Sequence, residues 1–151
     1  MLFSEDDDEL KRIVTTLFTK YKATHTDGVE WILKMRVQRD GERGTIHIDQ
    51  QFFIEEILKR TGMEACSLVA TPMTNIKSCY HENSPKLDYG RAKVYQETVG
   101  GLIHLMNGTR PDLTLAVGVL CRFMKAPEEQ HWLAMKRVLC YLQGSKKYRL
   151  T

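Results

Sequence analysis

Three consecutive carboxylates near the start of the chain are the side chains best suited by type to hold a divalent metal. Asp6, Asp7 and Asp8 stand within the run Ser-Glu-Asp-Asp-Asp-Glu. The carboxylates that hold catalytic metals come from several elements around one ion, whereas three in a row at a helix start diverge by about 100° per residue. Acidic residues also stabilise the positive end of a helix, and Ser4 is a residue type that caps one. We therefore predict a helix start capped by Ser4, and no metal.

The thiols and imidazoles do not form a metal or disulfide pattern either. The chain has four scattered cysteines: Cys66, Cys79, Cys121 and Cys140. Cys121, His131 and Cys140 could form a zinc module by residue type, but zinc sites use closely spaced cysteine pairs, and none exists here. We expect free thiols in a reducing compartment and no cofactor bound by this chain.

Positive charge is concentrated in the second part of the chain. Residues 1–65 carry 10 Lys and Arg against 13 Asp and Glu, whereas residues 66–151 carry 12 against 6. This imbalance suits the second part to a polyanion, with a merely solvated basic surface as the alternative. The cations that fall outside its apolar positions are candidates for phosphate contacts: Arg122, Lys125, Lys136 and Arg137.

The stretch Thr-Arg-Pro-Asp-Leu-Thr-Leu-Ala-Val-Gly-Val-Leu, residues 109–120, reads as the start of a helix. Thr109 can cap the helix, and Asp112 three residues later can complete a capping box. Pro111 costs little there, because the first N–H groups of a helix have no partner within it.

Gly118 lies inside this predicted helix and needs a reason, because glycine costs about 1 kcal/mol relative to alanine there. Helical spacing places it close to Thr114 and Lys125, with Arg122 beside them. One interpretation is that a nucleic-acid backbone approaches the bare position. The alternatives are a close helix–helix contact or simple tolerance of glycine.

The elements that must position these residues follow from hydrophobic periodicity. Alternating apolar residues from Trp31 to Val37, the turn sequence Arg-Asp-Gly-Glu-Arg-Gly and the returning residues 45–48 predict a β-hairpin over 30–50. His47 alternates with two isoleucines and is expected to face solvent. The spacing predicts a helix over 50–60 that ends at Gly62, and a first helix whose apolar residues are Leu10, Ile13, Val14, Leu17, Phe18 and Tyr21.

Residues 66–94 lose this periodicity and predict a linker or strap, which we expect to separate two packing units. Three amphipathic helices should follow, ending at Gly108, near Met124 and at Gly144, with Pro127 in the first turn of the last. Their apolar stripes are Tyr95, Val99, Leu102, Ile103 and Met106; Leu113, Ala116, Val117, Leu120 and Met124; and Trp132, Met135, Val138, Leu139 and Leu142. The expected fold class is α+β, with an N-terminal helix and hairpin and a three-helix bundle.

The bulk properties place few limits on function. The chain has 151 residues, 42% hydrophobic residues and a formal net charge of +3. It contains neither a secretory leader pattern nor an apolar run of about 18 residues, the length that a membrane span needs. We expect an intracellular protein, in the cytoplasm (in a virus-like particle) or the nucleus, without a membrane partner.

The second part of the chain resembles the closing part of a copia-type (Pseudoviridae-like) retrotransposon reverse transcriptase. That family shows Tyr-x-x-x-Val-Gly-x-Leu, then Thr-Arg-Pro-Asp-Leu-x-x-Ala-Val, then Arg-Phe-Met, Pro, His-Trp-x-Ala and Tyr-Leu-x-Gly. Here these residues are Tyr95, Val99, Gly100, Leu102, Thr109, Arg110, Pro111, Asp112, Ala116, Val117, Arg122, Phe123, Met124, Pro127, His131, Trp132, Ala134, Tyr141, Leu142 and Gly144. The similarity continues upstream through Gly-Met-Glu-Ala-Cys and the hairpin.

This resemblance implies a division into a palm-end segment (1–65), a strap (66–94) and a thumb-like bundle (95–151). The hairpin would act as a primer grip, with Trp31, Lys34 and Arg36 as the candidates for steering the primer end, and with a place in the core as the alternative for Trp31. The catalytic Tyr-x-Asp-Asp segment would precede Met1 and a ribonuclease H portion would follow. The resemblance implies Mg²⁺ for the complete enzyme but no polymerase activity for this chain alone.

The function we expect is to hold an RNA–DNA or DNA primer–template duplex through its phosphates, without reading sequence. Its partners would be that duplex and the missing fingers, palm and ribonuclease H portions of a polyprotein. Two departures from the family pattern favour a relic as the alternative: Ile32-Leu33-Lys34 replaces a Leu-Gly pair, and Cys121 replaces Ser. Such a truncated or domesticated remnant would bind a protein partner or have no function.

Overall fold

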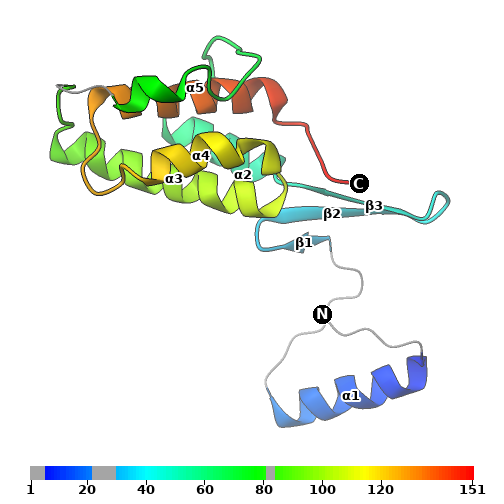
Figure 1. Cartoon of the computed structure of the whole chain (residues 1–151). Helices are drawn as coiled ribbons and strands as arrows, with labels where there is room; N and C mark the ends of the chain where they lie inside the picture. The colour runs from blue at the N-terminus through cyan, green and yellow to red at the C-terminus, as the bar shows by residue number, and fades with distance from the viewer. Residues whose placement is uncertain (1–5, 22–29, 81–83) are drawn as a thin grey trace.

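The computed structural model describes residues 6–21, 30–80 and 84–151 of the chain. Within these residues it contains five α-helices and a three-stranded antiparallel sheet, which confirms the expected α+β class. Figure 1 shows the sheet extending from one end of a layer of helices. None of the described helices is both long and apolar enough to cross a membrane.

The first helix begins within the run of carboxylates, as predicted. Helix α1 spans Asp7–Lys20, and the Asp6 carboxylate caps it by accepting hydrogen bonds from the backbone N–H groups of Asp8 (2.9 Å) and Glu9 (3.4 Å). Ser4, the predicted cap, lies outside the described residues. In Figure 1 α1 stands apart from the layer of helices, and none of its residues belongs to the described core.

The sheet contains one strand more than the predicted hairpin. Its strands are β1 (Trp31–Ile32), β2 (Met35–Asp40) and β3 (Thr45–Asp49), in the order β1-β2-β3. The predicted turn between β2 and β3 is confirmed, and its Gly44 has a φ of 63°. The prediction of one continuous strand from Trp31 to Val37 was wrong, because Leu33 and Lys34 form a two-residue turn in which both have positive φ, 49° and 64°.

The end of the chain returns to the sheet and covers part of β3. Leu150 and Ile48 form two backbone hydrogen bonds with each other, 2.9 and 3.0 Å long. Figure 1 shows the C-terminal segment, in red, running toward the sheet. His47 was predicted to face solvent, but it is half-buried and its Nδ1 lies 2.8 Å from the Thr151 hydroxyl. Strand periodicity depends on neighbouring residues, so it could not predict a contact between residues 104 positions apart.

The helical layer consists of α2 (Gln51–Arg60), α3 (Tyr89–Gly108), α4 (Thr114–Cys121) and α5 (Glu129–Ser145), with short 3₁₀ helices η1 (Ile76–Tyr80) and η2 (Pro111–Leu113). Helix α2 ends at Gly62 as predicted, with a φ of 65° at that glycine. Helix α3 begins inside the predicted linker, because the Asp88 carboxylate caps it by accepting from the Arg91 N–H at 3.0 Å.

The boundaries of the last helix also differ from the prediction. Pro127 lies before α5 rather than in its first turn, because Glu128 is the N-cap and forms a capping box with His131. The helix continues past Gly144 to Ser145. The start is decided by the contact between Glu128 and His131, which a proline signal alone does not reveal, and the end differs from the prediction by a single residue.

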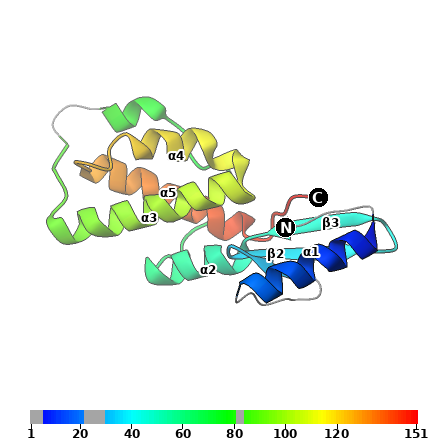
Figure 2. The same ribbon diagram turned by 90° about the horizontal axis from the view of Figure 1, so that it is seen from below.

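One hydrophobic core joins all four helices of the layer. It contains the predicted stripes and, from α2, the buried side chains Ile54, Ile57 and Leu58. Figure 2 shows α2 and α4 on opposite sides of α3 and α5. The domain boundaries stay a prediction, but α2, which precedes the strap, packs into the same core as the helices that follow it.

Candidate nucleic-acid interface

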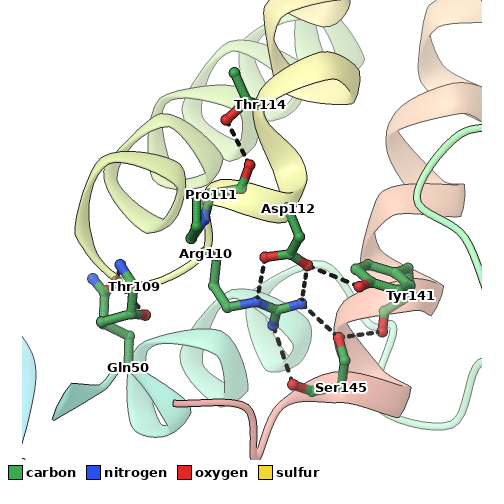
Figure 3. Close-up of polar contacts among 8 residues, drawn as sticks. All are labelled: Gln50, Thr109, Arg110, Pro111, Asp112, Thr114, Tyr141 and Ser145. Atoms are coloured by element: carbon green, nitrogen blue, oxygen red, sulfur yellow. Dashed lines mark hydrogen bonds and ion pairs between the residues drawn. The ribbon is translucent and has the colours of Figure 1, made fainter. Parts of the chain in front are cut away.

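Arg110 and Asp112 form a partly buried polar network instead of a helix cap (Figure 3). Arg110 is 1% exposed and its guanidinium donates to the two Asp112 carboxylate oxygens at 3.0 and 2.7 Å. It also donates to the backbone carbonyl of Ser145 at 3.1 Å and to the Ser145 hydroxyl at 2.7 Å. These four bonds join the segment between α3 and α4 to the end of α5, and the burial of Arg110 keeps its charge away from a ligand at the surface.

Two tyrosines complete the surroundings of this ion pair. The rings of Tyr141 and Tyr148 lie 5.5 and 5.4 Å from the Arg110 guanidinium carbon, within the range of a cation–π interaction. The Tyr141 hydroxyl donates to Asp112 at 2.8 Å. Burial alone would raise the pKa of the Asp112 carboxyl, but the hydrogen bonds from Arg110 and Tyr141 outweigh burial and hold that pKa below its ordinary value.

The predicted capping box of Thr109 and Asp112 was wrong. Thr109 ends α3 instead, and both its N–H and its hydroxyl donate to the buried Gln50 side-chain oxygen, at 3.1 and 2.9 Å (Figure 3). Asp112 accepts from the Arg110 guanidinium instead, which is a stronger donor than a backbone N–H because it is charged. The chain therefore passes through η2 before α4 begins at Thr114.

Gly118 lies on an open face of α4. Gly118 and Thr114 are exposed, and a Cβ built on Gly118 would meet no atom of the described residues within 4 Å. The interpretation that Gly118 permits a close helix–helix contact is therefore wrong within the described residues. Two interpretations of Gly118 remain. The open face of the helix binds a partner, or the helix simply tolerates a glycine there.

The two cations near this face have different surroundings. Arg122 is exposed and donates to the Tyr80 hydroxyl at 2.9 Å, which ties it to η1. Lys125 is exposed as well, but it lies beyond the helix, because α4 ends at Cys121 and a series of turns follows. The helical projection that grouped Lys125 with Thr114 and Gly118 therefore does not extend to it.

The two cations of α5, Lys136 and Arg137, also differ in exposure. Lys136 is exposed and lies close enough to Glu129 to lower the pKa of that carboxyl, after the larger effect of the hydrogen bond from Arg91. Arg137 is half-buried and donates to the Thr71 hydroxyl at 3.1 Å. Of this pair, Lys136 is the cation that is exposed to solvent.

The hairpin residues predicted to steer a primer are mostly engaged within the protein. Lys34 contacts Glu56 on α2 at 2.9 Å, and Arg36 contacts the buried Asp49 at 2.9 Å. Trp31 is 49% exposed, with its ring edge-on to Phe52 at a centroid distance of 5.2 Å. The structure thus leaves Trp31 accessible and gives both cations a carboxylate partner.

Sequence reasoning assigned no role in this region to Gln50 or Ser145, and it singled out Tyr141 and His131 only as motif residues or, for His131, as a rejected zinc ligand. Gln50, Tyr141 and Ser145 belong to the polar network, and His131 caps α5. The His131 Nδ1 accepts from the Glu128 N–H at 2.9 Å, and its Nε2 lies 2.9 Å from the Cys79 carbonyl. Because both nitrogens are engaged, His131 has no free lone pair for a metal. The spacing Glu-x-x-His, from Glu128 to His131, is the sequence feature that could have predicted this capping box.

The described residues contain no group of three or more His, Cys, Asp or Glu side chains that could hold a metal ion. Burial raises the pKa of the Cys66 thiol to about 11, with a further contribution from a hydrogen bond with Cys140. Cys79 and Cys121 also have pKa values raised by burial. These thiols are therefore protonated and weakly nucleophilic at neutral pH.

Comparison with known proteins gives relatives along nearly the whole chain. It is 30% identical over 149 residues to the retrovirus-related Pol polyprotein from transposon TNT 1-94 of Nicotiana tabacum, and 32% identical over 146 residues to that from transposon RE2 of Arabidopsis thaliana. Each alignment covers 96% of this chain but only 11% and 10% of the relatives, so the chain spans about a tenth of their length. The predicted resemblance is thereby confirmed at the level of the Pol polyprotein.

A third relative is a shorter protein of another kind. The secreted RxLR effector protein 161 of Plasmopara viticola is 52% identical over 56 residues, which cover 37% of this chain and 39% of the effector. No protein-family model matches the chain, and no solved structure matches it.

Proposed function

We propose that this chain is the closing part of a retrotransposon reverse transcriptase, which holds a primer–template duplex through its phosphates without itself catalysing polymerisation. The kind of enzyme is inferred from the Pol polyproteins similar to 96% of the chain. Mg²⁺ would belong to the catalytic part of the complete enzyme. The complete polymerase would operate inside the cell, in the cytoplasm or the nucleus.

The observation that carries the proposal is the open face of α4. Thr114 and Gly118 offer a small and a bare position, so a sugar–phosphate backbone could approach the helix closely there. Arg122 follows them on the chain, and its hydrogen-bond partner, the Tyr80 hydroxyl, brings no opposing charge to it. Lys125 and Lys136 would add phosphate contacts, and Trp31 would face the primer end. Contacts of this kind do not read base sequence.

The test is the binding of a fluorescein-labelled RNA–DNA hybrid to the full chain, measured by fluorescence anisotropy at several salt concentrations. Lys125→Glu should weaken binding and lower the slope of log affinity against log salt by about 1, the value expected for one lost phosphate contact. Lys59→Glu is the matched control, because Lys59 is an exposed cation on α2, on the far side of the helical layer from α4 (Figure 2).

Gly118→Leu tests the close approach without changing charge. It should weaken binding of the hybrid while the helical circular dichroism signal survives. Equal binding by the wild type and Gly118→Leu at low salt, or equal losses for Lys125→Glu and Lys59→Glu, would count against the proposal.

A second candidate function is a protein-interaction module derived from a retrotransposon. The similarity to a protein named as a secreted effector favours it, because a stretch like this one occurs there in a protein of another kind. The carboxylate partners of Lys34 and Arg36 favour it too, since they occupy two of the cations predicted to face a primer. A pull-down with nuclease-treated extract, run beside a gel shift with duplex, separates the two functions.

A further inference from the structure

A hollow of about 230 Å³ lies between the 72–78 segment and the outer side of α5. Its apolar walls come from Pro72 and Met73 on the segment and from Leu133 and Ala134 on the helix. Leu133 is 59% exposed, so the hollow opens to solvent. It lies outside the surface that the proposed function uses on α4.

One cation, Arg137, forms part of the wall of this hollow. Its Nη2 donates to the Thr71 hydroxyl at 3.1 Å, which holds the guanidinium beside the segment. Its Nε is enclosed by the protein and makes no hydrogen bond, and none of the ion pairs among the described residues involves Arg137. Arg137 is only half-buried, so the positive charge that lines the hollow has no carboxylate beside it among the described residues and can bind an anionic acceptor through the N–H groups that reach the hollow.

The walls and the cation together define the chemistry of a ligand. The apolar side chains named above are all non-aromatic, whereas proteins that bind unpaired bases usually stack them on aromatic rings. Aliphatic walls beside a fixed guanidinium instead match an aliphatic side chain next to a carboxylate, which Arg can bind through two parallel hydrogen bonds.

We propose that this hollow is a docking site for a protein segment in which an aliphatic residue stands beside an acidic one. The aliphatic side chain enters between the 72–78 segment and α5, and the carboxylate binds Arg137. This inference goes beyond the duplex-holding function and does not depend on it.

The experiment titrates the ¹⁵N-labelled full chain with the probe acetyl-Leu-Glu-amide and follows backbone amide chemical shifts. Saturable shifts are expected within residues 72–78 and 133–137. Acetyl-Leu-Gln-amide, which lacks the charge, should bind about tenfold or more weakly, as expected for loss of a charge-assisted hydrogen bond. Equal binding of the two peptides, or no saturable shift in these residues, would overturn the proposal.

Matched variants locate the site. Arg137→Gln should abolish the preference for the Glu peptide, whereas Lys136→Gln, which removes the adjacent exposed charge, should keep it. Leu133→Ser should weaken both peptides while Arg137 stays in place, and thermal melts establish that each variant is folded. If Lys136→Gln and Arg137→Gln lose the preference equally, or if a single-stranded oligonucleotide displaces the peptide from these residues, the assignment to an acidic protein segment is wrong.

Discussion

The Gln50 side chain accepts two hydrogen bonds from Thr109, which joins the end of β3 to the end of α3 across 59 residues of sequence. Both residues are buried. Gly108 lies directly beside this contact, and a Cβ added to it would collide with the Gln50 oxygen. The close approach that the sequence suggested for Gly118 therefore occurs at Gly108.

Gly108→Ala should consequently destabilise the protein by about 1–3 kcal/mol, the usual cost of overpacking. The Gln50 amide cannot move away freely, because it would lose both hydrogen bonds from Thr109. Urea unfolding followed by circular dichroism measures the change. A variant as stable as the wild type would show that Gln50 has room to move.

Gly118→Ala should have the opposite effect. Its Cβ enters open space on a regular helix, so alanine should stabilise the chain by about 0.5–1 kcal/mol through helix propensity. The same urea experiment applies, and the two alanine variants serve as each other's controls. A destabilised Gly118→Ala would mean that α4 is not a regular helix at this position.

Arg110→Ala should be among the most damaging single substitutions. It leaves the Asp112 carboxylate with only the Tyr141 hydroxyl as a donor and removes the Arg110 donor from the Ser145 carbonyl, and breaking a buried ion pair costs about 3–5 kcal/mol. Because Asp112 is partly exposed, the lower end of that range is expected. Arg149→Ala, at an exposed arginine of the C-terminal segment, should change the free energy of unfolding by less than about 0.5 kcal/mol.

The same ion pair predicts a loss of stability in acid. The folded-state pKa of Asp112 lies below its ordinary value of 3.8, so its contribution is present above that pH and is lost as the pH falls through the folded-state pKa. Melting temperatures measured from pH 7 to pH 2 should show this loss. Asp112→Asn should be less stable at pH 7 and should lose less on acidification, so parallel curves for the two proteins would contradict the assignment.

Cys66 should react slowly with alkylating reagents. Its pKa of about 11, against an ordinary value of 9.0, lowers its thiolate fraction at pH 8 about a hundredfold. Iodoacetamide labelling followed by peptide mass spectrometry should show slow modification of Cys66 that accelerates up to about pH 11. In urea the rate at pH 8 should rise to that of an unperturbed thiol, and a rate unchanged by urea would contradict this expectation.

Local signals predicted the elements well and their ends less well. The apolar stripe of α2 and its end at Gly62 were predictable, because both depend on neighbouring residues. The start of α3 was missed because Asp88 stands among residues that look like a loop, and only its bond to the Arg91 N–H marks it as a cap. The turn at Leu33 and Lys34 could not be predicted, since neither is a typical residue for positive φ. Contacts with His104 and Glu56 accompany it in the folded protein.

The sequence by itself determined the fold class, the amphipathic faces and the resemblance to a retrotransposon Pol polyprotein, because periodicity and motif spacing are properties of neighbouring residues. Only the tertiary structure decided what the motif residues do. Arg110 became a buried connector because Ser145 and Tyr148 come back to it from the end of the chain. Gly118 became an open surface because no element among the described residues packs over it. Whether a charge is buried and paired or free for a ligand depends on residues far apart in sequence, which only folding brings together.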